Sequence, residues 1–293
     1  MIAASAAVTG VEMTPGRLLD QFSLEMTARD IDALEQAAPL IPAGTRISVT
    51  FLPNEDFPAR VAAAATVRRL GFVPVPHISA RRLRSAAELE GFLESLAAAT
   101  GMRDVFVVAG DPPQPEGPYE DALAVVRTGL LGRYGVRHVG ISGYPEGHPD
   151  IDGGKLWRAL LDKHEALTGQ GLDYSIMTQF GFDADPILAW LEQVRGHDVS
   201  APVRLGVAGP ASVKTLLRFA ARCGVGASAK VMAKYGLSLT RLLGSAGPDP
   251  IIRDLVEGLD PAVHGDVRLH FYPFGGFTKT AQWVRDFQAA QTR

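Results

Sequence analysis

Short runs of β-branched and other apolar residues recur along the chain, and a segment with apolar residues at helical spacing follows most of them. The runs predict strands over residues 22–26, 46–51, 72–78, 104–110, 138–144, 174–180, 203–209 and 267–274. Strands that alternate with helices are typical of βα units with parallel pairing. Eight such units in 293 residues predict an α/β fold, a closed (β/α)₈ barrel of the TIM type.

Capping residues mark the ends of several predicted helices. Ser85 begins a capping box, and Gly101 is placed to end the same helix. Asp185, which stands before a proline, predicts the start of a second helix. Pro210 predicts the start of a third helix, over 210–224.

Residues 226–262 show helical spacing twice and no strand pattern, which predicts extra helices inserted before the last strand. We expect residues 1–293 to form one barrel domain, and the short stretch past Arg285 to leave no room for a C-terminal regulatory domain. An open, doubly wound sheet is the alternative fold. No G-x-G-x-x-G turn follows any predicted strand, which disfavours that alternative.

Composition excludes several classes of function. Twenty-nine Lys and Arg against 32 Asp and Glu give a net charge of −3, and neither a long basic run nor a long apolar run is present. We therefore expect no nucleic-acid partner, no membrane span and no signal peptide. The single Cys223 fits a reducing cytoplasm and a small core residue. No His, Cys or acidic cluster has the spacing of a metal site.

Polar groups follow the first six predicted strands at the point where each ends. Because the active site of such a barrel lies at the carboxyl ends of its strands, these groups predict one polar constellation. Gly110 stands before one of them, where the lack of a Cβ lets a ligand approach the backbone. The groups are Glu25, Thr50, His77, Asp111, Tyr144 with His148, and Gln179.

Four short motifs then carry a resemblance to a known family. They are G-D-x-P in "VFVVAGDPP", Y-P-E-x-H-P in "ISGYPEGHP", "TQFGFD", and H-F-Y in "LHFY". In this order they resemble the methylenetetrahydrofolate reductase family, from about residue 22 to 275. The resemblance implies a flavin-dependent (β/α)₈ barrel that reduces 5,10-methylenetetrahydrofolate to 5-methyltetrahydrofolate.

The resemblance also implies roles for individual residues. Glu25 matches the general acid that protonates folate N10, and burial would favour its protonated form. Asp111 matches a carboxylate beside the flavin and the pterin, and Gln179 matches a pterin contact. Contacts to FAD are implied for Thr50, His77, Ala109, Gly110, Asp111, Tyr119, Tyr144, His148 and Lys163. NADH or NADPH is the implied donor, and a homo-oligomer is expected.

Three positions depart from the family's pattern. Ala109 stands where an arginine often reaches the FAD diphosphate, Val213 where an aromatic side chain stacks on nicotinamide or folate, and Gly276 where an arginine contacts substrate. Lys163 or Arg158 could neutralise the diphosphate instead.

Two other functions stay open: direct hydride transfer from NADH to folate without flavin, and a non-catalytic folate-binding or partner-binding barrel. A general acid at Glu25 disfavours the non-catalytic reading. The basic stretch "ARRLRS" over 80–85 reads as a solvated loop or as a site for a phosphate or a polyglutamate tail.

Overall fold

Eight parallel strands close into a barrel in the computed structural model, which describes residues 12–52, 55–225 and 245–291. The order around the barrel is β1-β10-β7-β6-β5-β4-β3-β2. This confirms the predicted (β/α)₈ barrel and overturns the open sheet. The strands are β1 (Ser23–Met26), β2 (Arg46–Val49), β3 (Val73–Ser79), β4 (Asp104–Val108), β5 (His138–Gly143), β6 (Asp173–Phe180), β7 (Val203–Ala208) and β10 (Val267–Tyr272).

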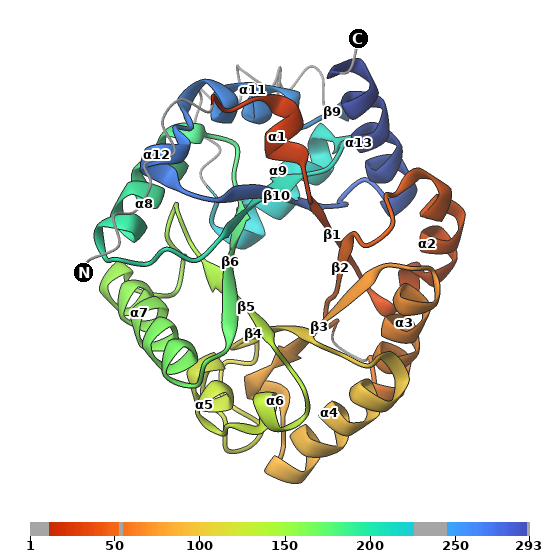
Figure 1. Ribbon diagram of the computed structural model, residues 1–293, viewed down its shortest axis with the longest axis vertical. Helices are drawn as coiled ribbons and strands as arrows, with labels where there is room; N and C mark the ends of the chain where they lie inside the picture. Colours follow the sequence, from red (N-terminus) through yellow and green to blue (C-terminus); the bar gives the residue numbers. More distant parts are fainter. Residues whose placement is uncertain (1–11, 53–54, 226–244, 292–293) are drawn as a thin grey trace, which may run out of the picture.

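Most of the helices surround the barrel (Figure 1). The described α-helices are α1 (Pro15–Leu19), α2 (Ile31–Ala37), α3 (Phe57–Arg69), α4 (Ala86–Thr100), α5 (Ala122–Arg127), α6 (Leu130–Arg133), α7 (Gly153–Gly169), α8 (Ala184–Gly196), α9 (Val213–Cys223), α11 (Asp249–Gly258), α12 (Pro261–His264) and α13 (Phe277–Gln291). The described residues also form three short 3₁₀ helices, η1 (Ala28–Asp30), η2 (Ala38–Leu40) and η3 (Ala80–Arg82). No helix within these ranges is long and apolar enough to cross a membrane.

The alternation of side chains along each strand separates the main core from the barrel interior. In β1, Leu24 and Met26 are buried in the large cluster that includes the surrounding helices. Their neighbours Ser23 and Glu25 therefore point the other way, into the barrel. The barrel interior thus receives polar groups, and the hydrophobic stabilisation comes chiefly from the layer between strands and helices.

A small apolar cluster of Val75, Phe106 and Met177 fills part of the barrel interior. Gly140 makes room for it, because a Cβ there would lie 2.6 Å from Cδ2 of Phe106. The glycine in β5 is therefore required by packing rather than by backbone conformation.

Two of the predicted helix starts move by a few residues. Ser85 Oγ accepts a hydrogen bond from the N–H of Glu88, and Gly101 ends α4 with φ of +58°, as expected. The second start is wrong by two residues, because the Asp183 carboxylate accepts the bond from the N–H of Asp185 and α8 begins at Ala184.

The start predicted at Pro210 is also wrong. Ser212 Oγ accepts the capping bond, and α9 begins at Val213. The helix is delayed because Ala211–Ser212 form a short strand, β8, which pairs antiparallel with β9 (Ser245–Ala246). The expectation of no strand in 226–262 is therefore wrong as well.

Helix α11 confirms one of the helices predicted in the 226–262 segment. Residues 226–244, where the first of them is predicted, lie outside the described residues. Helix α11 packs against α8, and α12 does the same, so this part of the chain completes the outer layer after β7.

A charged network lies at the amino end of the barrel strands, opposite the expected active site. The Asp104 carboxylate Oδ1 lies 3.1 Å from Arg46 Nε and 3.3 Å from His138 Nδ1, and only 11% of the Asp104 side chain is exposed. Burial alone would raise the pKa of Asp104. The contact with His138 and the charge of Arg46 outweigh that effect, so the pKa of Asp104 lies below the usual value.

We expect Asp104→Asn to lower the free energy of unfolding at pH 7 by about 1–3 kcal/mol, because it leaves the charge of Arg46 without its partner. Urea denaturation measures this. Asp286→Asn, which changes an exposed carboxylate, is the matched control and should change stability little. The difference between wild type and Asp104→Asn should begin to shrink as the pH falls through about 4, where Asp in the unfolded chain takes up its proton, and should vanish only once the pH is below the lowered pKa of the folded carboxylate. A difference that persists at low pH would contradict this account.

Candidate active site

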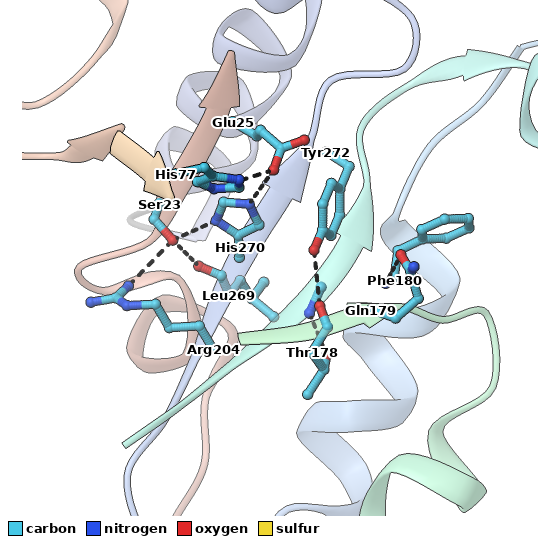
Figure 2. A network of polar contacts seen from close by, with 11 residues as sticks. Ser23, Glu25, His77, Thr178, Gln179, Phe180, Arg204, Leu269, His270 and Tyr272 are labelled. Atoms are coloured by element: carbon cyan, nitrogen blue, oxygen red, sulfur yellow. Dashed lines mark hydrogen bonds and ion pairs between the residues drawn. The ribbon is translucent and has the colours of Figure 1, made fainter. Parts of the chain in front are cut away.

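Glu25 lies inside the carboxyl end of the barrel, between two buried imidazoles (Figure 2). Its Oε2 is 3.9 Å from Nε2 of His77 on β3 and 3.9 Å from Nε2 of His270 on β10. The Glu25 side chain is 19% exposed, whereas His77 and His270 are almost fully enclosed. Three strands thus direct one carboxylate and two imidazoles at a common point.

Both imidazoles are held in the neutral form. Burial lowers the pKa of His77 to about 4; the carboxylate of Glu25 opposes this, and the charge of Arg60 adds to it. Burial also lowers the pKa of His270, although Glu25 again opposes the shift. Neither Nε2 atom has a hydrogen-bond partner within the described residues. Both rings therefore have an unused donor or acceptor directed toward Glu25.

Ser23 connects His270 to a buried arginine. Its Oγ lies 2.9 Å from His270 Nδ1, and Nη1 of Arg204 donates to that Oγ at 3.5 Å and to the carbonyl of Gln21 at 2.8 Å. The serine fixes the orientation of the His270 ring and thereby the direction of Nε2.

Sequence reasoning missed Ser23, Arg204 and the role of His270. Two signals could have found them. His270 stands in the H-F-Y motif, and Ser23 lies two residues before Glu25, which places it on the same face of a strand.

Tyr272 and Thr178 extend the polar interior toward β6. The Tyr272 hydroxyl donates to the carbonyl of Thr178 at 3.0 Å, and Thr178 Oγ1 accepts a bond from the N–H of Gly206. Burial raises the pKa of Tyr272 well above its usual value, so the hydroxyl stays protonated. The predicted pterin contact Gln179 follows directly, and its Oε1 accepts a bond from the N–H of Phe180 at 3.1 Å.

Asp111 lies on the rim of the barrel rather than in its interior. Its side chain is 58% exposed, and Oδ1 lies 2.7 Å from Nη2 of Arg82 on η3. Arg82 in turn lies over the ring of Phe51, 4.7 Å from its centroid. The basic stretch 80–85 is therefore not simply a solvated loop, because one of its arginines holds the loop that carries Asp111.

The remaining predicted residues directly follow β2 and β4, the two strands beside β3, which carries His77. Thr50 is half-buried, and its N–H donates to the carbonyl of Met26. The carbonyl of Ala109 accepts a bond from the N–H of Arg81. Gly110 has φ of +92°, a conformation that side chains rarely adopt, and a Cβ there would lie 3.3 Å from Ser79 Cβ.

Tyr144 and His148 meet in the loop after β5. Their rings are 5.4 Å apart and nearly perpendicular, and Nδ1 of His148 accepts a bond from the N–H of Asp150. Tyr144 and Cys223 are both close enough to Tyr272 to influence its pKa, so they border the same mouth.

The structure does not bring Tyr119 and Lys163 to the mouth. Each is only 6% exposed, and Tyr119 belongs to the main hydrophobic cluster. The Nζ of Lys163 donates to the carbonyl of Ala159 within α7, and burial lowers the pKa of Lys163 to about 8. Arg158 on the same helix is exposed. Val213 is buried, which agrees with its lacking a ligand contact.

Comparison with known proteins identifies the family. The family model of methylenetetrahydrofolate reductase matches residues 21–238, which include Glu25, His77, Asp111 and Gln179. The chain belongs to the methylenetetrahydrofolate reductase family.

Individual members of the family are distant. Methylenetetrahydrofolate reductase 2 of Saccharomyces cerevisiae is 27% identical over 155 residues, 50% of this chain and 25% of the yeast protein. Methylenetetrahydrofolate reductase (NADH) 1 of Arabidopsis thaliana is 29% identical over 139 residues, 43% of this chain and 23% of the plant protein. The matched stretch thus spans about a quarter of each relative's length.

A solved structure shares the fold. It is an uncharacterised protein from Clostridium thermocellum that binds two copies of 5-methyl-5,6,7,8-tetrahydrofolic acid, with a TM-score of 0.63 and 10% identity. The similarity covers 92% of this chain and 95% of that chain. At this identity it supports the barrel architecture alone.

The residues present fit one end of the FAD that this family implies. Thr50 follows β2, His77 lies in β3 and the Gly110–Asp111 pair follows β4, so these residues come from three neighbouring strands. The φ of +92° at Gly110 suits a residue without a Cβ, as expected where backbone contacts a ligand closely. The diphosphate end differs, because Ala109 has no charge and Lys163 is buried. Among the described residues, no group of three or more His, Cys, Asp and Glu side chains could hold a metal ion.

The lowered pKa of His77 predicts a stability that depends on pH. The unfolded chain binds the proton below about pH 6.5, whereas the folded protein binds it only near pH 4, so the free energy of unfolding falls as the pH drops between these values. We expect His77 to account for about 2 kcal/mol of the loss between pH 7 and pH 5.

Urea denaturation of His77→Gln at both pH values tests this, since the variant should lose that much less stability than wild type on acidification. His197→Gln, which changes an exposed imidazole, is the matched control and should behave as wild type does. Equal pH dependence of wild type and His77→Gln would contradict the assignment.

Proposed function

We propose that the protein reduces 5,10-methylenetetrahydrofolate to 5-methyltetrahydrofolate, with NAD(P)H as donor, FAD as the bound cofactor and Glu25 as the general acid. The observation that carries the proposal is the carboxyl group of Glu25 between two neutral imidazoles at the mouth of a barrel of this family. The Arabidopsis relative is named as an NADH enzyme, which favours NADH over NADPH.

The chemistry asks for a proton at one atom and a hydride at another. Protonation of folate N10 lets the bond between N10 and the methylene carbon break, and the electron pair of that bond stays on nitrogen. The carbon is left as an iminium conjugated with N5 and takes up the hydride. A carboxyl group that is only 19% exposed suits the first step, because water competes little for its proton.

His77 and His270 hold that proton in place. A neutral imidazole can donate to a carboxylate or accept from a carboxylic acid, so either ring can adapt to both states of Glu25. Their Nε2 atoms lie 3.9 Å from Oε2, a separation that tightens with small movements when substrate fills the mouth. Ser23 limits the movement of His270, and the bond from Arg60 to the His77 carbonyl limits that of β3.

FAD, when bound, would supply the two-electron relay between the nicotinamide and the folate. Thr50, His77, Gly110 and Asp111 would hold its ring, with Tyr144 and His148 beyond them. Asp111 would also orient the pterin, and Gln179 would contact the pterin through its amide. The exposed position of Asp111 leaves its second oxygen available to a ligand while Oδ1 bonds Arg82.

Direct hydride transfer from NADH without flavin is the second candidate. It is favoured by one observation, the absence of an accessible cation at Ala109 and Lys163, where the FAD diphosphate would otherwise be neutralised. Both candidates keep Glu25 as the acid. They differ in whether a flavin remains bound.

The visible absorbance spectrum of the purified protein separates these candidates. We expect a yellow protein that bleaches on anaerobic addition of NADH and recovers its colour when methylenetetrahydrofolate is added. A colourless protein that oxidises NADH in the presence of methylenetetrahydrofolate would support direct transfer instead. A protein that neither binds added FAD nor oxidises NADH would overturn both.

We expect Glu25→Gln to lower kcat for folate reduction by about 10²- to 10⁴-fold, because glutamine has no acidic proton to give. Binding of the folate should change much less, since the amide keeps the shape of the carboxyl group. Steady-state rates and titration calorimetry measure the two effects. Glu257→Gln, on the exposed face of α11, is the control. Full activity of Glu25→Gln would remove Glu25 from the mechanism.

A further inference from the structure

Three partly buried aromatic side chains form a row beside the barrel mouth. The rings of Tyr272 and Phe274 are 5.7 Å apart and inclined by 16°, and those of Phe274 and Phe219 are 4.0 Å apart and inclined by 12°. They come from the end of β10, from the loop after it, and from α9. All three belong to or pack against a cluster that is separate from the main core.

The inner end of this row adjoins the proposed acid. The ring of Tyr272 lies 4.9 Å from that of His270 and nearly perpendicular to it. His270 in turn faces Glu25 at 3.9 Å. A molecule whose reactive nitrogen reaches Glu25 therefore has the edges of these rings along one side.

The outer end of the row carries a positive charge. The guanidinium carbon of Arg218 lies 5.3 Å from the ring centroid of Phe219, and Arg218 is exposed. Within the described ranges, no carboxylate forms an ion pair with it. An exposed guanidinium of this kind is available to an anionic group of a ligand.

Helix α9 lies across the mouth rather than outside the barrel. At its end, a Cβ on Gly224 would lie 2.6 Å from Cδ of Pro149, so the helix contacts the loop after β5. Cys223, the last residue of α9, also lies near Tyr144 and Glu25. The charge of Cys223 contributes to the raised pKa of Tyr144, and the charge of Glu25 contributes to the raised pKa of Cys223. The row is thus one wall of the mouth.

We propose that Tyr272, Phe274 and Phe219 form the wall that holds the p-aminobenzoyl ring of the folate, and that Arg218 binds a carboxylate of its glutamate tail. This proposal rests on the proposed function. The order of groups matches the substrate: an acid for N10, apolar ring edges for the aryl group, and a cation for the carboxylates. Aromatic side chains suit an aryl ring in edge-to-face or offset contact.

The same wall accounts for two departures from the family's pattern. Val213 is buried, and Gly276 has no side chain, so neither supplies the aromatic or cationic contact expected there. Phe274 with Phe219 and Arg218 supply the same two kinds of contact from other positions.

The test compares two probes, tetrahydrofolate and tetrahydropteroate, which differ by the glutamate tail. We expect Arg218→Gln to raise the Kd for tetrahydrofolate about three- to fivefold, as for an exposed ion pair, and to leave that for tetrahydropteroate unchanged. Arg222→Gln, one turn further along α9 and also exposed, is the matched control and should bind both probes as wild type does.

Phe274→Leu tests the ring contact separately. It should weaken both probes by a similar factor, up to about tenfold, because both carry the aryl ring. Thermal unfolding of each variant checks that it folds. Calorimetry gives the Kd values without turnover.

Two outcomes overturn the inference alone: Arg218→Gln that binds tetrahydrofolate as tightly as Arg222→Gln, or that weakens both probes equally, with wild type still binding and reducing folate. A wild-type protein that binds neither probe would overturn the proposed function as well. Retention of full affinity by Phe274→Leu would remove the aromatic wall and leave only the cation.

Discussion

Glu25 shares its part of the barrel interior with two buried imidazoles. Its carboxylate opposes the lowering of both imidazole pKa values by burial. Burial disfavours the charged form of an imidazole there, so the pKa values of His77 and His270 are lowered and both rings remain neutral. The proximity of these three side chains depends on closure of the barrel. The ring of strands places β10 beside β1 and places β3 two strands away, so side chains 245 residues apart in sequence (270 − 25) meet at one oxygen atom.

The two ends of the barrel use polar groups differently. At the amino end, Asp104 is paired with Arg46 and His138, so the buried negative charge of its carboxylate is compensated. At the carboxyl end, the Nε2 atoms of His77 and His270 have no hydrogen-bond partner in the part of the chain that the structure describes, which lowers stability and leaves both atoms able to bind a ligand. This arrangement is typical of such barrels, in which the amino-terminal face contributes to stability and the carboxyl-terminal face carries the active site.

The side chains around the mouth come from several neighbouring elements. Arg82 on η3 holds Asp111 from the adjacent loop, and an aromatic row from β10, the loop after it and α9 lies beside His270 and Glu25. The contacts around the family's motif residues are therefore provided from several elements. The residues at the mouth fit the ring end of a flavin better than its diphosphate end, because Ala109 has no charge and Lys163 is buried.

The sequence by itself determined the fold and the place of Glu25 at the carboxyl end of a strand. Eight apolar runs and their spacing specify eight strands, because a strand that is buried on both faces has apolar residues at nearly every position. The positions of Glu25, His77 and Asp111 at strand ends could be predicted for the same reason. Only the tertiary structure decided that His270 and Ser23 face Glu25, that Asp111 lies on the rim, and that Lys163 is buried. Those relations depend on which strands are neighbours in the closed barrel and on how helices α7 and α9 pack, and long-range packing leaves no periodic signal in a single chain.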